Sequence, residues 1–365
     1  MSTLNGNELH TLQQTGLPSP TTLPFHKQLR SLGKRALDYL PDPFHSARTF
    51  SKSPSENLFA PVVVATEKYL LLSDIHKLPR EQLLFETGEF AVFQARSWQL
   101  PHLLTEIGRL REMAFRAVGE GTGNRLDLDK YDAYYDHLFV WHKDEGALVG
   151  AYRIGRVDEI LKVFGKKGLY THTLFKLKKA FFKATGPMLE LGRSFVNPDY
   201  QRTPSALFLL WKGIGQFILR HPKYKLLFGP VSISNTYTEL SRQMMVDYLT
   251  AYALHREFAD LVKPRQPFRP TVAKNWDAKI TTRMISSVDE LSTFISTIET
   301  DHKGIPTLLK HYLKLEGKIL GFNVDAAFCN ALDGLILVDL KATNDRLLER
   351  YLGEGWVNRL NGLPQ

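Results

Sequence analysis

The chain has 365 residues, of which 43% are hydrophobic and 23% are charged, and its formal net charge is +9. This composition excludes a fully disordered, collagen-like or coiled-coil protein, and the length suffices for one large domain or two ordinary ones. The positive charge favours an anionic partner, such as nucleic acid, a membrane surface, a phosphate-bearing cofactor or an acidic carrier protein.

Several classes of protein are excluded by what the sequence lacks. A lone cysteine, Cys329, rules out an intramolecular disulfide framework and a cysteine-based zinc site. No run approaches the roughly 18 apolar residues of a membrane span, and the start has no secretion signal. His302 and His311 are too widely spaced to bind a metal from one helix face. We expect a cytoplasmic protein with no metal, and contact with the inner membrane surface stays open.

Residues 1–83 are predicted to form an arm, because the first 60 are rich in Ser, Thr and Pro. Within the arm, His26–Leu40 places leucines at helical spacing beside lysines and arginines, which predicts a basic amphipathic helix. Such a helix would dock either on the domain or on a membrane surface.

Residues 84–262 show mixed strand and helix periodicity and are predicted to form the core. A Pro-rich connector over Lys263–Asp277 then leads into a C-terminal extension, residues 263–365, that should pack on the core. The turn at 143–146 predicts an antiparallel hairpin between its flanking strands. The expected strands are Glu89–Ala95, His137–His142, Ala147–Val157, Met188–Val196, Lys225–Ser234 and Leu335–Leu340, and the expected helices are Ser97–Val118, Ala206–Arg220, Thr236–His255, Val288–Ile298, Pro306–Leu315 and Asn344–Leu352.

Three ordered blocks carry a resemblance to a known family. They are residues 189–202 (LELGRSFVNPDYQR) with 210–214 (LWKGI), residues 227–234 (LFGPVSIS), and residues 305–315 (IPTLLKHYLKL) followed by DAAF at 325–328 and DG at 333–334. Together they resemble the ornithine-lipid type of N-acyltransferase, which is related to the acyl-homoserine-lactone synthases of the GNAT superfamily.

The resemblance implies an α/β (α+β) fold with a GNAT-like, mixed and mostly antiparallel sheet flanked by helices. It also implies transfer of a fatty acyl group, often 3-hydroxylated, from an acyl carrier protein to the amine of an amino acid such as ornithine, which makes a lyso-aminolipid. No permanent cofactor is expected, and acyl-ACP or acyl-CoA would be the co-substrate. Two alternatives remain: acyl-CoA-dependent transfer to a soluble amine, and a non-catalytic lipid-binding or carrier-binding module.

Amide formation from a thioester requires a deprotonated amine, donors for the oxyanion and a stabilised leaving thiol. The family pattern suggests Glu190 as the base, with Gly192 allowing close approach of the backbone, and with Arg153 and Arg193 orienting charged groups. The alternative for Glu190 and Arg193 is an ion pair at a strand edge.

The acceptor site is expected at Arg111, Phe115, Asp127, Asp129 and Asp132, which correspond in order to positions of the lactone synthases. Carboxylates would suit a cationic amine, and an arginine would bind a substrate carboxylate in bidentate fashion. The aspartates are equally compatible with helix caps and a solvated loop.

The donor phosphopantetheine is expected at Arg202, Thr203, Ser205 and Ala206, ahead of a helix whose free backbone amides would bind an anion. Ser205 stands where the GNAT pattern has a central glycine, which favours a carrier protein over coenzyme A. A plain helix cap is the alternative.

A lysine-rich insert over residues 162–183 contains no acidic residue and interleaves lysines with aromatic side chains. It would suit docking of an acidic acyl carrier protein. A lipid headgroup surface and a merely solvated basic face are the alternatives. Nucleic acid is not expected, because no nucleic-acid-binding signature accompanies the charge. The lysines expected to dock the carrier are Lys166, Lys167, Lys178 and Lys179.

Overall fold

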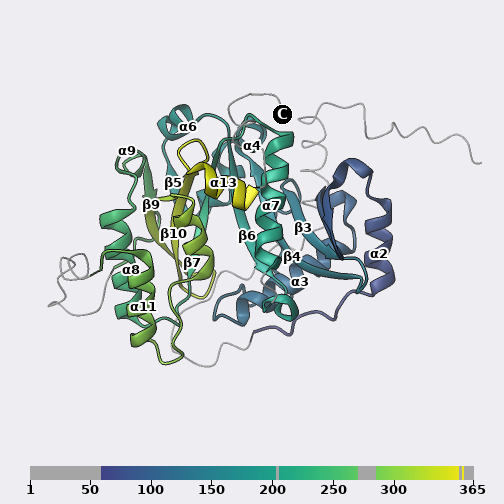
Figure 1. Cartoon of the computed structure of the whole chain (residues 1–365), viewed down its shortest axis with the longest axis horizontal. Helices are drawn as coiled ribbons and strands as arrows, with labels where there is room; N and C mark the ends of the chain where they lie inside the picture. The colour runs from purple at the N-terminus through teal and green to yellow at the C-terminus, as the bar shows by residue number, and fades with distance from the viewer. Residues whose placement is uncertain (1–58, 203–204, 270–284, 353–355, 357–365) are drawn as a thin grey trace, which may run out of the picture.

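The computed structural model describes residues 59–202, 205–269, 285–352 and 356 (Figure 1). The predicted helix over His26–Leu40 and most of the predicted arm lie outside these ranges, as does Thr203. Residues 59–83, which the sequence assigned to the arm, belong to the folded domain. They include helix α2 (Lys68–Lys77), whose buried Asp74 accepts hydrogen bonds of 2.8 Å from the backbone N–H groups of His102 and Leu103.

One eight-stranded sheet organises the described part of the chain, in the order β1-β2-β3-β4-β6-β7-β10-β9. Every neighbouring pair is antiparallel except β6 and β7, which are parallel. The mixed, mostly antiparallel sheet that the resemblance implied is therefore confirmed. Its strands are β1 (Leu83–Thr87), β2 (Phe90–Arg96), β3 (Asp136–His142), β4 (Ala147–Arg156), β6 (Met188–Val196), β7 (Leu226–Ile233), β9 (Lys318–Asp325) and β10 (Ala331–Asp339).

Helices cover both faces of the sheet (Figure 1). Strand residues alternate between the faces, so Leu138 and Val140 of β3 join one core while Phe139 and Trp141 join another. On one face lie α7 (Ser205–Arg220), α8 (Glu239–Tyr252), α11 (Val288–Ile298), α12 (Thr307–Lys314) and α13 (Asp345–Leu352); on the other lie α3 (Leu103–Arg116), α4 (Val157–Phe164), α5 (Thr171–Leu174) and α6 (Lys179–Thr185).

The segment predicted as a C-terminal extension contributes to the sheet itself. β10 pairs with β7 over eight residue pairs, from Leu332↔Ile233 to Asp339↔Leu226, and β9 adds outside β10. The sequence predicted only the second half of β10 and did not predict β9. A shift of register between Leu335 and Ile336 interrupts the pairing of these two strands, so their pattern is irregular.

The lysine-rich insert folds into α4, α5 and α6 with a short strand, β5 (Phe175–Leu177), that pairs with β8 (Val262–Pro264). Its aromatic residues serve the core, because Phe175 and Phe181 are fully buried against the sheet. Short 3-10 turns (Arg80–Gln82, Ser97–Gln99, Gly165–Gly168, Pro198–Tyr200) and the one-turn helix α9 (Arg256–Ala259) complete the elements in the described ranges.

Candidate active site

The two parallel strands part in the middle of the sheet. β6 and β7 pair only from Met188↔Leu226 to Glu190↔Phe228, and beyond that point the chains diverge. They come very close just before they separate, since a Cβ added at Gly229 would lie 2.0 Å from the carbonyl oxygen of Leu191. Arg193 then has a φ of 49°, which is unusual for a residue other than glycine and bends β6. Glycine in β7 and the bend in β6 together create an opening between the strands.

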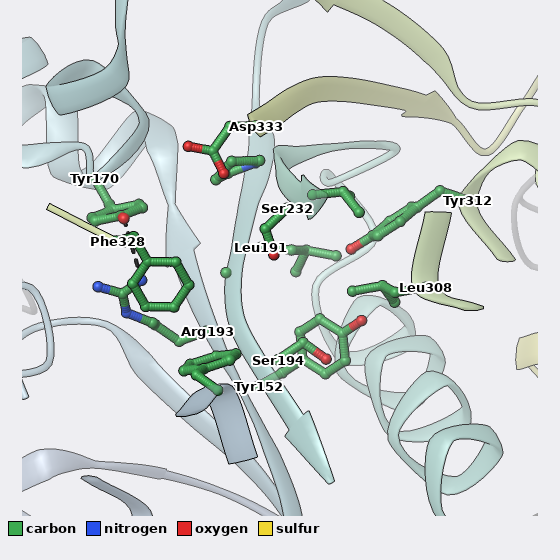
Figure 2. Close-up of a pocket in the computed structure, with 14 residues that line it drawn as sticks. Tyr152, Tyr170, Leu191, Arg193, Ser194, Ser232, Leu308, Tyr312, Phe328 and Asp333 are labelled. Atoms are coloured by element: carbon green, nitrogen blue, oxygen red, sulfur yellow. Dashed lines mark hydrogen bonds between the residues drawn. The ribbon is translucent and has the colours of Figure 1, made fainter. Parts of the chain in front are cut away.

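Two adjoining cavities fill this opening. The smaller has a volume of about 60 Å³ and is lined by Arg193 of β6, Ser232 of β7, Asp333 of β10 and Tyr170, which precedes α5 (Figure 2). The larger has a volume of about 530 Å³, and its walls include Ala114, Val118, Phe195 and Val196. Phe115, Ser194, Val231, Ser232 and Leu308 line both cavities. A small polar chamber thus adjoins a larger one with mainly apolar walls.

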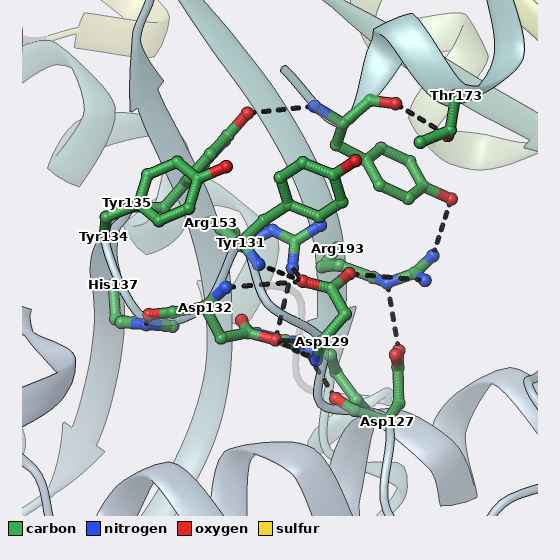
Figure 3. A network of polar contacts seen from close by, with 12 residues as sticks. Asp127, Asp129, Tyr131, Asp132, Tyr134, Tyr135, His137, Arg153, Thr173 and Arg193 are labelled. Atoms are coloured by element: carbon green, nitrogen blue, oxygen red, sulfur yellow. Dashed lines mark hydrogen bonds and ion pairs between the residues drawn. The ribbon is translucent and has the colours of Figure 1, made fainter. Parts of the chain in front are cut away.

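Six charged residues singled out from the sequence meet in one buried network, shown in Figure 3. Arg111 forms a two-pronged ion pair with Asp132, with N–O distances of 2.8 and 3.3 Å. Arg153 Nη1 lies 2.6 Å from Asp129 Oδ1 and 3.2 Å from Asp132 Oδ2. Arg193 Nε lies 3.2 Å from Asp127 Oδ2. Three guanidinium groups therefore bind three carboxylates.

The arginines keep most of this network charged. Burial alone would raise the pKa of Asp132, but Arg111 and Arg153 outweigh burial and hold that pKa below its ordinary value. Burial does raise the pKa of Asp127, which Arg193 only partly offsets. Burial would likewise lower the pKa of Arg153, yet Asp129 and Asp132 raise it above the ordinary value.

Of the six members of this network, Arg193 is the one that lines either of these two cavities. Arg193 lines the smaller one, where its guanidinium carbon lies 4.8 Å from the ring centre of Tyr170 and 4.9 Å from that of Phe328. Arg111, Arg153 and the three aspartates line neither cavity, and instead contact one another behind Arg193. Phe115, in contrast, lines both cavities.

The position of Glu190 argues against its predicted role as base. Its side chain is 1% exposed and accepts hydrogen bonds from the Tyr135 hydroxyl and from the backbone N–H of Thr171. Burial raises its pKa in spite of those two hydrogen bonds. A general base must reach the proton that it removes, and Glu190 lines neither cavity. Its two hydrogen bonds instead join β6 to Tyr135 and to the start of α5.

The predicted donor residues follow the end of β6. Arg202 is exposed, Ser205 begins α7 and Ala206 is 2% exposed, while Thr203 lies outside the described residues. None of these lines either cavity, whereas the neighbouring Gln201 lines the larger one.

The predicted carrier-docking lysines precede β6. Lys167, Lys178 and Lys179 are exposed, but Lys166 is half-buried and donates a 2.9 Å hydrogen bond to the carbonyl oxygen of Leu177. Along the chain, Lys178 and Lys179 stand at the start of α6, which precedes the nine-residue strand β6, whereas the donor residues follow that strand.

The cavity residues that were not assigned a role from the sequence include Glu120, Tyr170, Ser232 and Asp333. Glu120 is 4% exposed and accepts a 2.8 Å hydrogen bond from Ser232 Oγ. Burial raises the pKa of Glu120 to about 7. Ser232 and Asp333 fall within the blocks that carry the family resemblance, so that signal was present, whereas no motif marks Glu120 or Tyr170.

Comparison with known proteins agrees with this architecture. Residues 110–212, which run from α3 into α7, match the model of the acetyltransferase (GNAT) domain. The chain is 37% identical over 181 residues to a glycine N(alpha)-acyltransferase of Phocaeicola vulgatus, covering 47% of this chain and 54% of that protein. It is 28% identical over 256 residues to an L-ornithine N(alpha)-acyltransferase of Rhodobacter capsulatus, covering 67% of this chain and 88% of that protein.

Among solved structures, the AHL synthase LasI aligns with a TM-score of 0.30 and 16% identity over 45% of this chain and 80% of that one, a likeness too low to support an argument. The chain spans about half the length of the glycine acyltransferase that it matches. Within residues 59–202, 205–269 and 285–352, no helix combines the length and hydropathy that crossing a membrane requires. Residues 110–212 thus match a GNAT domain, and parts of the chain are similar to proteins named as glycine and L-ornithine N(alpha)-acyltransferases.

Proposed function

We propose that this protein transfers a fatty acyl group from a thioester to the amine of an amino acid, forming an amide. The observation that carries the proposal is the opening between β6 and β7, where a small chamber with charged walls adjoins a larger, mainly apolar one. An amino acid needs charged partners and a fatty chain needs apolar surface. The relatives named for glycine and ornithine acylation support the same assignment.

The reacting carbonyl would lie where the strands part. Beyond Glu190 the edge of β6 is no longer paired with β7, which leaves backbone groups of that edge facing the cavity. Backbone N–H groups directed at the position where negative charge develops are an effective way to stabilise a tetrahedral intermediate. The larger cavity, with a volume of about 530 Å³, would hold the chain.

The donor would be an acyl group, 3-hydroxylated in the form that the resemblance implies, on an acyl carrier protein. Ser205 stands where the GNAT pattern has its central glycine. A side chain at this position limits the close approach of a pyrophosphate, which supports a carrier protein rather than coenzyme A as the acyl donor. Transfer from acyl-CoA is the second candidate for the donor.

The test uses the full-length protein with acyl-ACP or acyl-CoA of the same chain length and a panel of amino acids that includes glycine and ornithine. Mass spectrometry should detect an N-acyl amino acid with at least one acceptor. If no combination gives an amide, the protein is not this enzyme, and a lipid-binding or carrier-binding module becomes the better description.

Charge reversal can test two candidate docking surfaces for the carrier, namely the lysines that precede β6 and Arg202, which follows it. The double change Lys178→Glu and Lys179→Glu should raise the KM for acyl-ACP several-fold and leave the KM for acyl-CoA unchanged, because exposed charges mainly steer association with an acidic partner. Arg202→Glu provides the matched comparison at the second surface. If only Arg202→Glu weakens the use of acyl-ACP, the carrier docks near the start of α7 and the lysine surface is excluded.

A further inference from the structure

The smaller cavity contains a carboxylate that forms no close ion pair with any of the described residues. Asp333 lies on β10, opposite Ser232 of β7 and Asn323 of β9, and is 5% exposed. It lines the cavity (Figure 2), and its Oδ2 is buried without a hydrogen-bond partner in the part of the chain that the structure describes. A buried carboxylate in this state is costly, so it requires either a proton or a cation from outside the protein.

The charged residues around Asp333 increase its need for a proton or a cation. Burial raises the pKa of Asp333 well above the ordinary value, and the neighbouring Asp325 and Glu120 raise it further. Arg193 is the cation that opposes them, but its Nε already lies 3.2 Å from Asp127. Asp333, Asp325 and Glu120 therefore lie near one cation, Arg193, which is already paired with Asp127. A cationic group that entered the cavity would relieve the imbalance.

We propose that Asp333 binds the amine of the acceptor and takes its proton, while Arg193 binds the carboxylate of the same molecule. This inference rests on the proposed function. It assigns the smaller cavity to a free α-amino acid, whose amine and carboxylate are attached to one carbon and match the aspartate and the arginine that both line this cavity.

The size of the cavity agrees with this class of ligand. Its volume of about 60 Å³ is room for about four to six water-sized groups, given that one water needs about 10–15 Å³. The amine, α-carbon and carboxylate of an amino acid are five non-hydrogen atoms. A longer side chain would have to extend toward the larger cavity, which the two cavities permit because they share wall residues such as Phe115 and Leu308.

The proposed reaction balances as follows. The acceptor enters as an ammonium ion, and one proton passes from its nitrogen to the Asp333 carboxylate. The free lone pair attacks the thioester carbon, so that a C–N bond forms and the C–S bond breaks. A second proton leaves the nitrogen and ends on the thiolate, which departs as a thiol. Asp333 then releases its proton to solvent. Burial and the nearby acids raise the pKa of Asp333, which makes its carboxylate a stronger proton acceptor than that of an ordinary aspartate.

The decisive variant is Asp333→Asn, assayed with the best amino-acid acceptor of the wild-type panel. General base catalysis contributes about 10²–10⁴-fold, so kcat/KM at pH 7 should fall at least 100-fold. Asn cannot accept the proton, so only the neutral amine would react, and the residual rate should rise about tenfold per pH unit between pH 7 and pH 9. The wild-type profile should be flatter. A merely structural residue would lower the rate without steepening the pH profile.

Two control variants separate proton transfer to Asp333 from a loss of negative charge elsewhere in the protein. Asp144→Asn, in the exposed turn after β3, should leave both the rate and the pH profile unchanged. Glu120→Gln preserves an acceptor for the Ser232 hydroxyl and should cost less than tenfold in rate. Thermal unfolding should show Asp333→Asn to be at least as stable as the wild type at pH 8, since it removes an unpaired carboxylate.

The outcomes are distinguishable from failure of the proposed function. If the wild-type protein makes no N-acyl product, the proposed function fails first. If the wild type is active and Asp333→Asn retains more than a tenth of that activity with an unchanged pH profile, Asp333 is not the base. A large loss in Glu120→Gln combined with an active Asp333→Asn would assign the base to Glu120 and overturn the inference.

Discussion

Two groups of carboxylates near the parting of β6 and β7 differ in their partners: Asp127, Asp129 and Asp132 pair with arginines, whereas Glu120, Asp325 and Asp333 lie around the smaller cavity without such close pairs among the described residues. In the network behind Arg193, arginines lie 2.6 Å from Asp129 and 2.8 Å from Asp132. Around the smaller cavity, Asp333 has no such partner among the described residues, and the pKa values of Glu120 and Asp325 are raised mainly by burial. Each carboxylate of the first group has an arginine partner within the fold. In the second group, we propose that the amine of a ligand is the partner of Asp333.

The largest effect on stability should come from removing one arginine of the network behind Arg193. Arg153→Met would remove the 2.6 Å ion pair of Asp129, leaving it the 4.0 Å contact with Arg193, and would remove one of the two arginines that pair with Asp132. Removing one partner of a buried ion pair costs about 3–5 kcal/mol. Urea denaturation should show this loss in the free energy of unfolding. Arg202→Met, at an exposed position, should change it by less than about 0.5 kcal/mol. If Arg153→Met is equally harmless, the network does not support the fold.

The stability contributed by Glu120, in the second group, should fall as the pH rises. An ordinary paired carboxylate shows the opposite behaviour, because its contribution falls as the pH is lowered. The folded pKa of Glu120, about 7, lies above its unfolded value near 4.5. The folded state therefore holds a proton that the unfolded state has lost, and this contribution to stability disappears as the pH rises toward and past 7. Glu120→Gln should remove the effect, so its stability relative to wild type should improve by about 2–3 kcal/mol between pH 5 and pH 8.

The measurement is urea denaturation of wild type and Glu120→Gln at several pH values. The paired Asp132 provides the contrast, because its pKa is lowered in the folded state and its stabilisation persists until strongly acidic pH. A difference between the two proteins that does not change from pH 5 to pH 8 would contradict the raised pKa of Glu120.

The smallest expected effect concerns the hydrogen bond that connects the cavity wall to Glu120. Ser232→Ala removes the donor 2.8 Å from Glu120, which should raise the pKa of Glu120 further. A hydrogen bond to a charged group contributes about 1.5–3 kcal/mol, but only while Glu120 is ionised. Stability should therefore fall by about 1–2 kcal/mol at pH 9 and change little at pH 5. An equal loss at both pH values would show that the serine acts through packing.

Much of the fold was predictable because it follows from local patterns. The alternation in Met188–Val196 and the helical spacing in Val288–Ile298 predicted elements with the bounds that the structure has. The hairpin of β3 and β4 followed from the turn between them. Prediction failed for β9, where a register shift disturbs the strand period, and for α2, which lies next to a segment whose composition suggested an arm.

For the site, the sequence singled out charged residues that the structure brings together, but it could not show which of them face a cavity. Arg111, Asp132 and Arg153 do assemble, as their correspondence to the lactone synthases suggested, but they bind one another. Glu190 was chosen for its place in a motif, and nothing in a linear pattern could show that Tyr135 and Thr171 enclose it.

The sequence by itself indicated the resemblance to GNAT acyltransferases, the alternation of most strands and helices, and the charged residues available to a site, because these depend on residue type and local spacing. Only the tertiary structure decided where β6 and β7 part and which carboxylates obtain an arginine. Asp132 and Asp333 are the same residue type in buried positions, and they differ because segments distant in the chain bring Arg111 and Arg153 to one, and no comparable partner to the other.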